Sequence, residues 1–350
     1  MIPAGTDRRS AGPPVPGSEW LEADGRGGFA SGTANLVRTR RYHALLLAAG
    51  APASGRFVLV NGVEAAVETP DGRYPISSQA YLPGVVHPDG ASRIENFEAD
   101  PWPAWTFRLG EGVRVTQEVF ASRRTGATAL VWRLPRRRLD VWLSVRLLFS
   151  GRDSHALHRE NPAFRFQAQR RGYGWLWIPY DGVPEINVAT NGSYSHDPLW
   201  YRNFFYSEEK ARGLDATEDL ASPGTFRFDL SKGEAVVLLS TEPPAGEDDA
   251  VLIARRLRIE ERRRRFSFSS RLARAADDYI VDRGEGKAIV AGYPWFGQWG
   301  RDTFIALRGL CLAAGRLDDA REILLTWAER LSEGMLPNRF PDRGGTPEYN

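Results

Sequence analysis

The hydrophobic pattern of this chain changes its period near Pro244, and this change constrains the fold more than any other feature. From Trp20 to Pro244, apolar and polar residues alternate in short runs, which is the pattern of half-buried β-strands. After Pro244 the apolar residues recur every three to four positions, as they do along helices. The sequence therefore predicts a multidomain β + α protein, in which a large antiparallel β-sandwich precedes a set of helices.

Turn signals and alternating runs support the β prediction. Residues 57–60 and 63–67 flank Asn61-Gly62, a strong signal for a two-residue hairpin because both residues tolerate positive φ. Further strands are predicted at residues 105–109, 113–119, 141–147, 226–230 and 235–239, with turns at 110–112 and 231–233. No strand alternates with a long helix in this part of the chain, so a parallel α/β sheet is not favoured.

A linker helix is predicted where the period changes. Its run of four arginines, residues 262–265, could suggest a nucleic-acid patch, but Glu260 and Glu261 lie beside it and interleaved aromatic residues are few. A solvated helix face is the favoured interpretation, as for most charge runs. The predicted division of the chain is a flexible tail over 1–17, a sandwich over 18–245, a linker helix over 246–268 and a helical domain over 269–350.

Three helices are predicted in the last part of the chain. One face of the first combines Leu272, Ala275, Ala276, Tyr279 and Ile280. The second, residues 303–314, is apolar almost all round and is expected to be buried, with Gly315 as its terminating residue. The third, residues 317–331, has a predicted buried side made of Ala320, Ile323, Leu324, Trp327, Ala328 and Leu331. Short connections predict antiparallel pairs, and the pattern stops in a loop, so this domain is expected to be incomplete.

Charge and cysteine content exclude several classes of protein. The 46 basic and 44 acidic residues nearly cancel, so the whole chain has no field that would recruit nucleic acid or an anionic membrane. Cys311 is the only cysteine, which rules out an internal disulfide and favours a reducing compartment. The first residues contain no apolar segment typical of a secretory signal, and no run is long enough to span a membrane. A cytoplasmic protein is expected.

Four long stretches resemble the bacterial and archaeal type of glycogen debranching enzyme, an amylo-α-1,6-glucosidase. They begin EWLEADGRGGFASG at Glu19, HDPLWYRNFFYSEEK at His196, AGYPWFGQWGRDTF at Ala291 and AREILLTWAERLSEG at Ala320. The resemblance implies a sandwich followed by the first helices of an (α/α)6 barrel. It also implies inverting hydrolysis of α-1,6-linked glucose stubs on glycogen, limit dextrin or branched maltodextrin.

The same resemblance implies that no catalytic residue can be assigned in this chain. An inverting glycosidase needs a carboxylic acid and a carboxylate base, about 6.5–9.5 Å apart. In the family the acid is an aspartate a few residues beyond the motif that matches Pro347-Glu348-Tyr349-Asn350, and the base lies far downstream. The chain is therefore expected to be truncated before its acid and inactive by itself.

The sugar-binding half of the site is expected to be partly present. Trp299-Gly300-Arg301-Asp302 is similar to a Trp-Thr-Arg-Asp motif of glucoamylases, in which the Arg–Asp pair holds hydroxyls of the terminal glucose. A guanidinium donates in a fixed fork and a carboxylate accepts from hydroxyls, which suits such a role. The alternative interpretation is that Asp302 caps the helix and Arg301 only pairs with it.

Other candidates lie nearby in the sequence. Trp295, like Phe296 and Trp299, is predicted either to stack on the glucan or to pack under the barrel rim. Asn338 is expected to bond a sugar or orient the acid. Tyr349 and Asn350, which directly precede the expected acid, are predicted to support it without touching sugar.

The remaining polar motifs favour structural roles. The glycine-rich run from Asp24 to Gly28 lacks the Lys-Ser/Thr end of a phosphate loop, so a turn is predicted. The polar cluster of residues 38–43 is expected at the interface of sandwich and barrel, and residues 200–203 are expected to pack within the sandwich. His155 and His158 have no third ligand at a recognised spacing, and neither a metal nor a cofactor is expected.

Two alternatives to a debranching glucosidase remain open. The sandwich could make the chain a non-catalytic glucan-binding or scaffolding module, in which case glucans would be bound without turnover. Another (α/α)6 α-glucosidase is also compatible with the loop at Trp299-Gly300-Arg301-Asp302, although the long N-terminal match argues against it. The oligomeric state cannot be read from the sequence.

Overall fold

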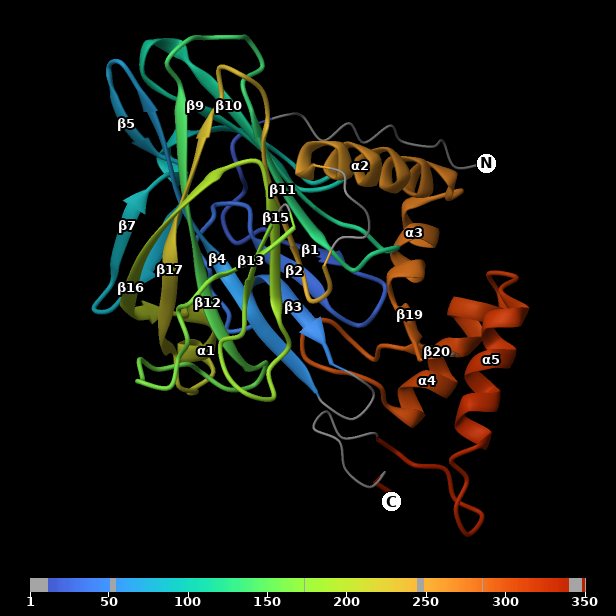
Figure 1. Cartoon of the computed structure of the whole chain (residues 1–350). Helices are drawn as coiled ribbons and strands as arrows, with labels where there is room; N and C mark the ends of the chain where they lie inside the picture. Colours follow the sequence, from blue (N-terminus) through green and yellow to red (C-terminus); the bar gives the residue numbers. More distant parts are fainter. Residues whose placement is uncertain are drawn as a thin grey trace.

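The computed structural model describes residues 12–50, 55–172, 174–243, 249–284, 286–339 and 348–349. Two large antiparallel sheets form a sandwich, and a smaller body of helices and one hairpin lies beside it (Figure 1). The predicted fold class is thereby confirmed for the sandwich. Most of the tail predicted over residues 1–17 lies outside the described residues, although Gly12 pairs with Phe97 as a β-bridge.

The larger sheet has ten strands, nine of them in the order β1-β2-β3-β4-β12-β17-β16-β6-β7, and β5 pairs with β4. These strands are β1 (Glu19–Ala23), β2 (Phe29–Thr33), β3 (Ala44–Ala49), β4 (Arg56–Thr69), β5 (Gly72–Pro75), β6 (Ser78–Tyr81), β7 (Val85–Asp89), β12 (Trp142–Asp153), β16 (Ser193–Phe205) and β17 (Thr217–Asp229). A short helix, α1 (Ser207–Ala211), joins β16 to β17.

The second sheet has eight strands in the order β13-β14-β15-β18-β11-β10-β9-β8. These strands are β8 (Ile94–Glu98), β9 (Ala104–Arg108), β10 (Arg114–Ala121), β11 (Thr128–Arg133), β13 (Gln169–Arg171), β14 (Gly174–Trp177), β15 (Ile186–Thr190) and β18 (Ala235–Ser240). The turn predicted at residues 110–112 is a short 3-10 segment between β9 and β10, which pair in antiparallel register as expected.

The main core lies between the two sheets. Val145 and Phe226 point inward from the larger sheet, and Phe107 and Trp132 point inward from the smaller one. All four are at most 1% exposed. Since neighbouring strand residues point to opposite faces, the alternating runs in the sequence supply one buried face per strand.

The continuous apolar run in β18 is explained by a third layer. Val237 faces the main core, whereas Val236 packs against Ala254 and Leu257 of helix α2 (Ala250–Ser267). The helix covers the outer side of the eight-stranded sheet, so β18 is buried on both faces (Figure 1). Asp249 caps α2 by accepting from the Leu252 amide at 2.8 Å, as expected for an N-cap residue.

The hairpin predicted at Asn61-Gly62 is wrong. These residues lie in the middle of β4, a single strand of fourteen residues. The register with β12 shifts between the pairs Leu148↔Gly62 and Phe149↔Val60, so Asn61 is the extra residue of a bulge. Its buried amide donates to Glu218 at 3.2 Å, and this tertiary partner explains why a residue typical of turns is found inside a strand.

The C-terminal body differs from the three helices that the sequence predicted. Its elements are α3 (Arg271–Asp278), β19 (Ile280–Arg283), β20 (Gly286–Ile289), α4 (Gly300–Leu307), η3 (Arg308–Leu312, π-helical) and α5 (Leu317–Ala328). The first predicted helix is wrong beyond Tyr279, because Ile280 begins a hairpin strand and pairs with Ile289. Leu272, expected on the buried face, is 79% exposed. The hairpin signal was present in the β-branched residues that flank the glycines at 284 and 286.

Helices α4 and α5 bury only one side within the described residues. Leu307, Cys311, Ile323 and Trp327 form their core together with the β19–β20 hairpin. The predicted burial of residues 303–314 on all sides is wrong, because Ile305 and Leu312 are 69% and 50% exposed. On α5, the expected burial is confirmed for Ala320, Ile323 and Trp327 and is wrong for Leu324, Ala328 and Leu331. Gly315 does follow the helix, with a φ of +72°.

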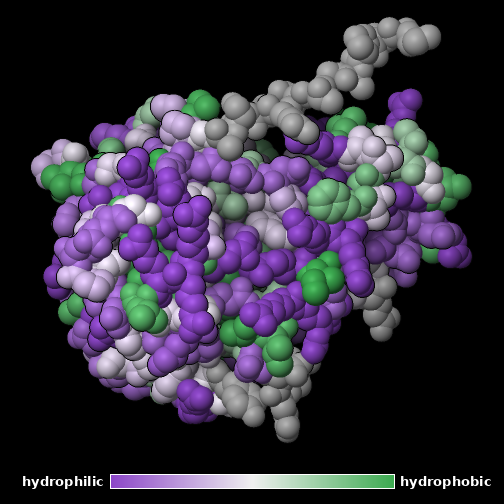
Figure 2. All heavy atoms as spheres, turned by 90° about the horizontal axis from the view of Figure 1, so that it is seen from above, coloured by the Kyte–Doolittle hydropathy of each residue, from purple (hydrophilic) through white to green (hydrophobic). Residues whose placement is uncertain are grey.

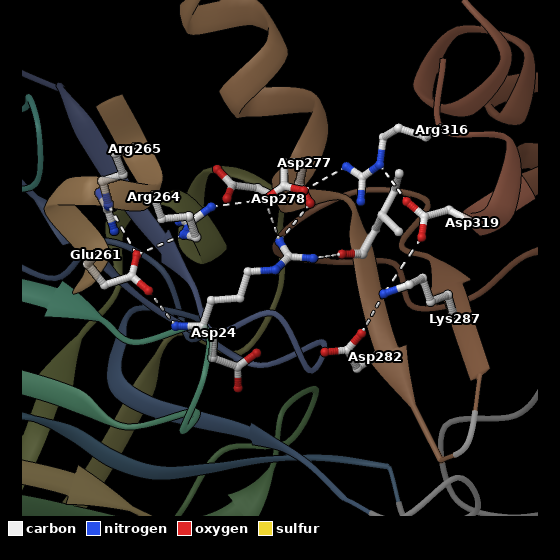
Figure 3. A network of polar contacts seen from close by, with 12 residues as sticks. Asp24, Glu261, Arg264, Arg265, Asp277, Asp278, Asp282, Lys287, Arg316 and Asp319 are labelled. Atoms are coloured by element: carbon white, nitrogen blue, oxygen red, sulfur yellow. Dashed lines mark hydrogen bonds and ion pairs between the residues drawn. The ribbon is translucent and has the colours of Figure 1, made fainter. Parts of the chain in front are cut away.

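Ion pairs join the C-terminal body to the sandwich (Figure 3). The network begins within the sandwich and its covering helix, where Arg265 of α2 binds Glu22 of β1 through two contacts of 3.0 and 2.5 Å, and both side chains are at most 7% exposed. Arg123, after β10, donates to the Asp277 carbonyl at 2.8 Å and also pairs with its carboxylate. Asp277 in turn binds Arg316 at 2.6 Å, which continues the chain of contacts to α5.

This network corrects the interpretation of the four-arginine run. Arg262 and Arg263 are exposed, but Arg264 and Arg265 point into the network and bind Glu261. The run is therefore solvated on one side of α2 only. Acidic partners distant in sequence, such as Glu22 and Asp277, could not be assigned from the local charge pattern.

Figure 2 shows the molecule from above, turned by 90° from the view of Figure 1. This side has no single large apolar patch. It is mainly hydrophilic, and its hydrophobic residues lie in small separate groups. Among the described residues, no helix has the length and apolar character needed to cross a membrane.

Candidate functional site

The candidate site is built where three loop segments meet at the start of α4. Trp299 and Arg339 form a β-bridge, and Arg339 forms a second one with Glu348. The Gly300 amide donates to the Asn338 carbonyl at 2.7 Å, and the Asn338 amide donates to Glu348 at 2.7 Å. Segments that are almost forty residues apart are thus held together by backbone hydrogen bonds.

Gly300 is required for this close approach. A Cβ atom at this position would lie 2.6 Å from the Pro337 carbonyl oxygen and 3.2 Å from the Trp327 ring. Contacts as short as the first do not occur in folded proteins without a shift of the backbone. The glycine therefore lets α4 begin directly against the loop that carries Asn338.

The side chains at the start of α4 are accessible. Trp299 is the N-cap residue and its side chain makes no capping hydrogen bond, and Asp302 lies within the first turn, so the alternative interpretation of Asp302 as the helix cap is not supported. Arg301 and Asp302 lie 3.5 Å apart and are 72% and 37% exposed. The Arg–Asp pairing itself is present, and within the part of the chain that the structure describes neither group has a buried partner that would occupy its hydrogen-bonding capacity.

Aromatic side chains flank this pair. Phe296 meets Trp299 edge to face, with ring centroids 6.3 Å apart. The guanidinium of Arg339 lies 5.2 Å from the centre of the Trp299 ring. Arg339 was not singled out in the sequence. Its bridge to Trp299 depends on the fold, and no local signal would have identified it.

Not all predicted residues join this cluster. Trp299, Arg301 and Asp302 lie together at the start of α4, and the backbone of Asn338 is bonded to the same turn. Trp295 instead turns towards the sandwich, where its ring lies 5.5 Å from the guanidinium of Arg40 and 5.2 Å from that of Arg212. The Tyr349 hydroxyl donates to the Arg330 carbonyl at 2.9 Å, beside the cluster. Asn350 lies outside the described residues.

The polar motifs of the sandwich have structural partners. The Asp24 carboxylate accepts from the Arg26 and Gly28 amides at 2.7 and 2.9 Å, which makes the glycine-rich run the turn between β1 and β2, as predicted. Burial raises the pKa of Asp24 to about 6, against the lowering effect of these two amides. The backbone of Asp282 donates to Gly25 at 2.8 Å, so this turn also contacts the C-terminal hairpin.

The predicted interface cluster of residues 38–43 is divided between two places. Arg40 reaches Trp295, as an interface residue would, whereas Arg38 points into the sandwich and donates to Gln79 at 3.0 Å. His43 is 2% exposed, and burial together with the nearby arginines lowers its pKa to about 3. His43 is therefore neutral, and its 3.6 Å approach to Glu19 is no ion pair.

A cleft of about 710 Å³ lies between the sandwich and the β19–β20 hairpin, and Asp24, Arg56, Asp282 and Gln298 are among the residues that line it. None of the predicted sugar-binding side chains lines this cleft. Among the described residues, no group of three or more His, Cys, Asp or Glu side chains is arranged to hold a metal ion. His158 instead contacts the Tyr180 hydroxyl at 2.6 Å.

Comparison with known proteins gives two family matches. The family model for the N-terminal part of glycogen debranching enzymes matches residues 18–237, and the amylo-α-1,6-glucosidase model matches residues 274–350. A glycogen debranching enzyme of Saccharomyces cerevisiae is 43% identical over 68 residues, which make up 18% of this chain and 4% of that enzyme.

A solved structure is similar in fold. A bacterial glucoamylase, crystallised as a complex with acarbose, matches with a TM-score of 0.50 and 11% identity, over 100% of this chain and 55% of that protein. At this identity the likeness concerns the fold, and it agrees with the predicted sandwich followed by helices of an (α/α)6 barrel. The chain thus spans about half the length of that glucoamylase and a small part of the yeast enzyme.

Proposed function

The chain belongs to the glycogen debranching enzyme family, and on this premise we propose that the protein hydrolyses single α-1,6-linked glucose stubs on branched α-glucans. The observation that carries the proposal is the cluster at the start of α4, in the part of the chain that matches the amylo-α-1,6-glucosidase family. An accessible Arg–Asp pair follows a tryptophan there, and the backbone of Asn338 is hydrogen-bonded to the same turn. The substrates that follow are glycogen, limit dextrin and branched maltodextrin.

Each residue of the cluster has a proposed role. Arg301 donates to two hydroxyls of the terminal glucose and Asp302 accepts from a hydroxyl, since a guanidinium fork and a carboxylate are complementary to such groups. Trp299 presents a ring to the apolar face of the sugar. Asn338 bonds a further hydroxyl or orients the catalytic acid, and Tyr349 and Asn350 support that acid.

The proposed reaction is inverting. One carboxylic acid protonates the leaving oxygen while a carboxylate activates water on the opposite face of the ring, with the two groups about 6.5–9.5 Å apart. We assign neither carboxyl group within these 350 residues. The roles given to Arg301 and Asp302 concern binding, so they can be tested on this chain without turnover.

The test is a binding measurement by calorimetry with a branched limit dextrin and a linear maltooligosaccharide. We expect Arg301→Ala and Asp302→Asn each to weaken binding at least about tenfold, since each removes charge-assisted hydrogen bonds to sugar. Arg165→Ala is the matched control, because Arg165 also forms an exposed Arg–Asp pair, with Asp181 at 2.6 Å, but lies in the sandwich. Equal affinity of all three variants and the unmodified chain would refute the assigned roles.

Two further readouts separate this function from the alternatives. Tighter binding of branched than of linear glucan supports a debranching role, whereas equal binding of both favours a general glucan-binding module. A preference for linear α-1,4 chains or for trehalose would favour another α-glucosidase. We also propose that these 350 residues, without the two catalytic carboxyl groups, do not hydrolyse glucan by themselves, and glucose release by the purified chain would contradict this part of the proposal. The cytoplasmic location remains a prediction.

A further inference from the structure

We propose that Arg40, Arg56 and Arg212 of the sandwich are positioning residues, which hold the loop that presents Trp299 and Arg301 to the sugar. The role in sugar binding rests on the proposed function, but the holding of the loop does not. The sandwich thereby takes part in the site through three arginines, of which only Arg40 lies in the cluster that the sequence placed at the interface.

Arg56 makes the most direct contact. It is the first residue of β4 and is 5% exposed, so its guanidinium is fixed within the sandwich. One terminal nitrogen donates to the Pro294 carbonyl at 3.1 Å, and the other donates to the Trp295 carbonyl at 2.6 Å. One planar guanidinium thus donates to two neighbouring carbonyls of the loop. A lysine, with a single ammonium group, could not reproduce this geometry.

The side chain of Trp295 is held from the same domain. The guanidinium carbons of Arg40 and Arg212 lie 5.5 and 5.2 Å from the centre of its ring, within the range of cation–π attraction. Arg40 is itself fixed by Glu19 at 2.7 Å and by Glu208 at 3.4 Å. Trp295 therefore acts in this proposal as an anchor of the loop, and the ring proposed to contact the glucan is that of Trp299.

The loop transmits this anchoring to the start of α4. The Phe296 amide donates to Gly292 and the Ala291 amide donates to Gly297, both at 2.8 Å, so residues 291–297 form a closed turn. Phe296, next to the anchored tryptophan, packs edge to face on Trp299. A shift of Pro294 and Trp295 would therefore displace Trp299 and with it the first turn of α4.

The experiment compares Arg56→Ala, Arg56→Lys and Arg212→Ala with the unmodified 350-residue chain. Amide hydrogen exchange of residues 291–299 reports the loop, and calorimetry with branched limit dextrin reports the site. We expect Arg56→Ala to speed exchange there about tenfold and to weaken binding about tenfold, because two charge-assisted hydrogen bonds are lost. Arg56→Lys should recover part of both effects, and Arg212→Ala should change each about two- to threefold.

Arg41→Lys is the matched control. Arg41, with a side chain that is 12% exposed, also binds two carbonyls, those of His155 at 2.7 Å and Asp215 at 3.1 Å, but none of its hydrogen bonds or ion pairs is with the loop. It should lower the stability of the sandwich without changing loop exchange or affinity.

Each outcome decides the proposal. Unchanged exchange at residues 291–299 in Arg56→Ala would overturn it, and so would faster exchange with unchanged affinity. The same loop response in Arg41→Lys would also overturn it, because the effect would then reflect general destabilisation. If the unmodified chain binds no glucan, the proposed function fails, whereas the exchange data still decide whether these arginines hold the loop.

Discussion

In the sandwich, Trp132 and Phe149 are buried completely between two sheets, whereas in α4 and α5 the side chains of Ile305 and Leu325 are 69% and 50% exposed. The sandwich thus has a core of its own, and α2 closes its outer face. The C-terminal body packs around a hairpin and is tied to the sandwich by ion pairs, by hydrogen bonds to backbone carbonyls and by the ring of Tyr293, which packs on Phe29. The difference teaches that the sandwich is stabilised by a closed apolar core, whereas the C-terminal body has a smaller, one-sided core and adds polar contacts with the sandwich.

The largest expected effect is the loss of a core tryptophan. Trp132 is 0% exposed, and its indole nitrogen donates to Gln117 at 2.8 Å. Trp132→Ala should lower the free energy of unfolding by about 4 kcal/mol, because it leaves a large cavity and an unpaired amide. Urea denaturation followed by circular dichroism measures the change.

Trp327→Ala is the counterpart in the C-terminal body. Trp327 is 1% exposed and packs on Phe304. We expect faster hydrogen exchange in α4, α5 and β20 and little change in the main unfolding transition, since regions with separate cores can open separately. If both variants lower one common transition equally, the two regions unfold as one unit and the comparison fails.

The next effect comes from the buried ion pair that fixes α2 to the sandwich. Arg265→Ala leaves the Glu22 carboxylate buried without its arginine partner, and breaking such a pair costs about 3 kcal/mol. The exposed pair of Arg165 and Asp181 is the control, because Asp181→Ala removes a solvent-screened contact and should change the free energy of unfolding much less. Equal losses for the two variants, measured by thermal unfolding, would mean that the Glu22–Arg265 pair stabilises the protein no more than an exposed pair does.

The predictability of the fold follows the same division. Strands such as β9, β10 and β17 were predictable because each buries one face. Burial of one face requires an apolar residue at every second position, and this alternation is visible in the sequence. Asn61-Gly62 was misassigned because its buried partner, Glu218, is 157 residues away. The burial of α4 was misjudged because periodicity shows which residues are apolar, not whether a neighbouring element covers them. The network partners of Arg265 depend on the tertiary fold in the same way.

The candidate site was predictable to the extent that it is local. Trp299, Arg301 and Asp302 are consecutive or nearly so, and the family pattern placed Asn338 with them. The positions of Trp295, Arg56 and Arg339 were not predictable. Their contacts arise where the sandwich, the loop before α4 and the loop after α5 meet. The spacing of residues along the sequence does not indicate that these three segments are neighbours.

A smaller effect should appear as a pH dependence at the junction. Burial raises the pKa of Asp278 to about 6, although nearby arginines oppose the shift. Because the folded state then binds a proton more readily than the unfolded state, this group stabilises the fold below its ordinary pKa of 3.8, and that stabilisation is lost as the pH rises through about 6. Asp278→Asn should therefore stabilise the protein at pH 7, by about 1 kcal/mol since the side chain is partly solvated.

The measurement for Asp278 is a series of unfolding midpoints between pH 4 and 7. In the unmodified protein, ionisation of Asp278 lowers the stability as the pH rises. Asp278→Asn should not show this decline. His43 has the opposite sign: its lowered pKa favours the fold above about 6.5, and that contribution is lost as the pH falls towards 3. Asp278→Asn, in which His43 is intact, therefore keeps a fall in stability on acidification, and a profile identical to that of the unmodified protein would contradict the shift assigned to Asp278.

The smallest expected effect tests the exposed side of the C-terminal body directly. Ile305→Gln on α4 should change the free energy of unfolding by no more than about 0.5 kcal/mol, as substitutions at exposed positions usually do. The same substitution at Ile323, which is 0% exposed on α5, should cost about 3 kcal/mol, because it buries an amide among Leu307 and Trp327. A loss above about 1 kcal/mol at Ile305 would show that this side chain is covered in solution. The C-terminal body would then bury apolar surface on two sides, as the sandwich does, and the two regions would differ mainly in the size of their apolar cores.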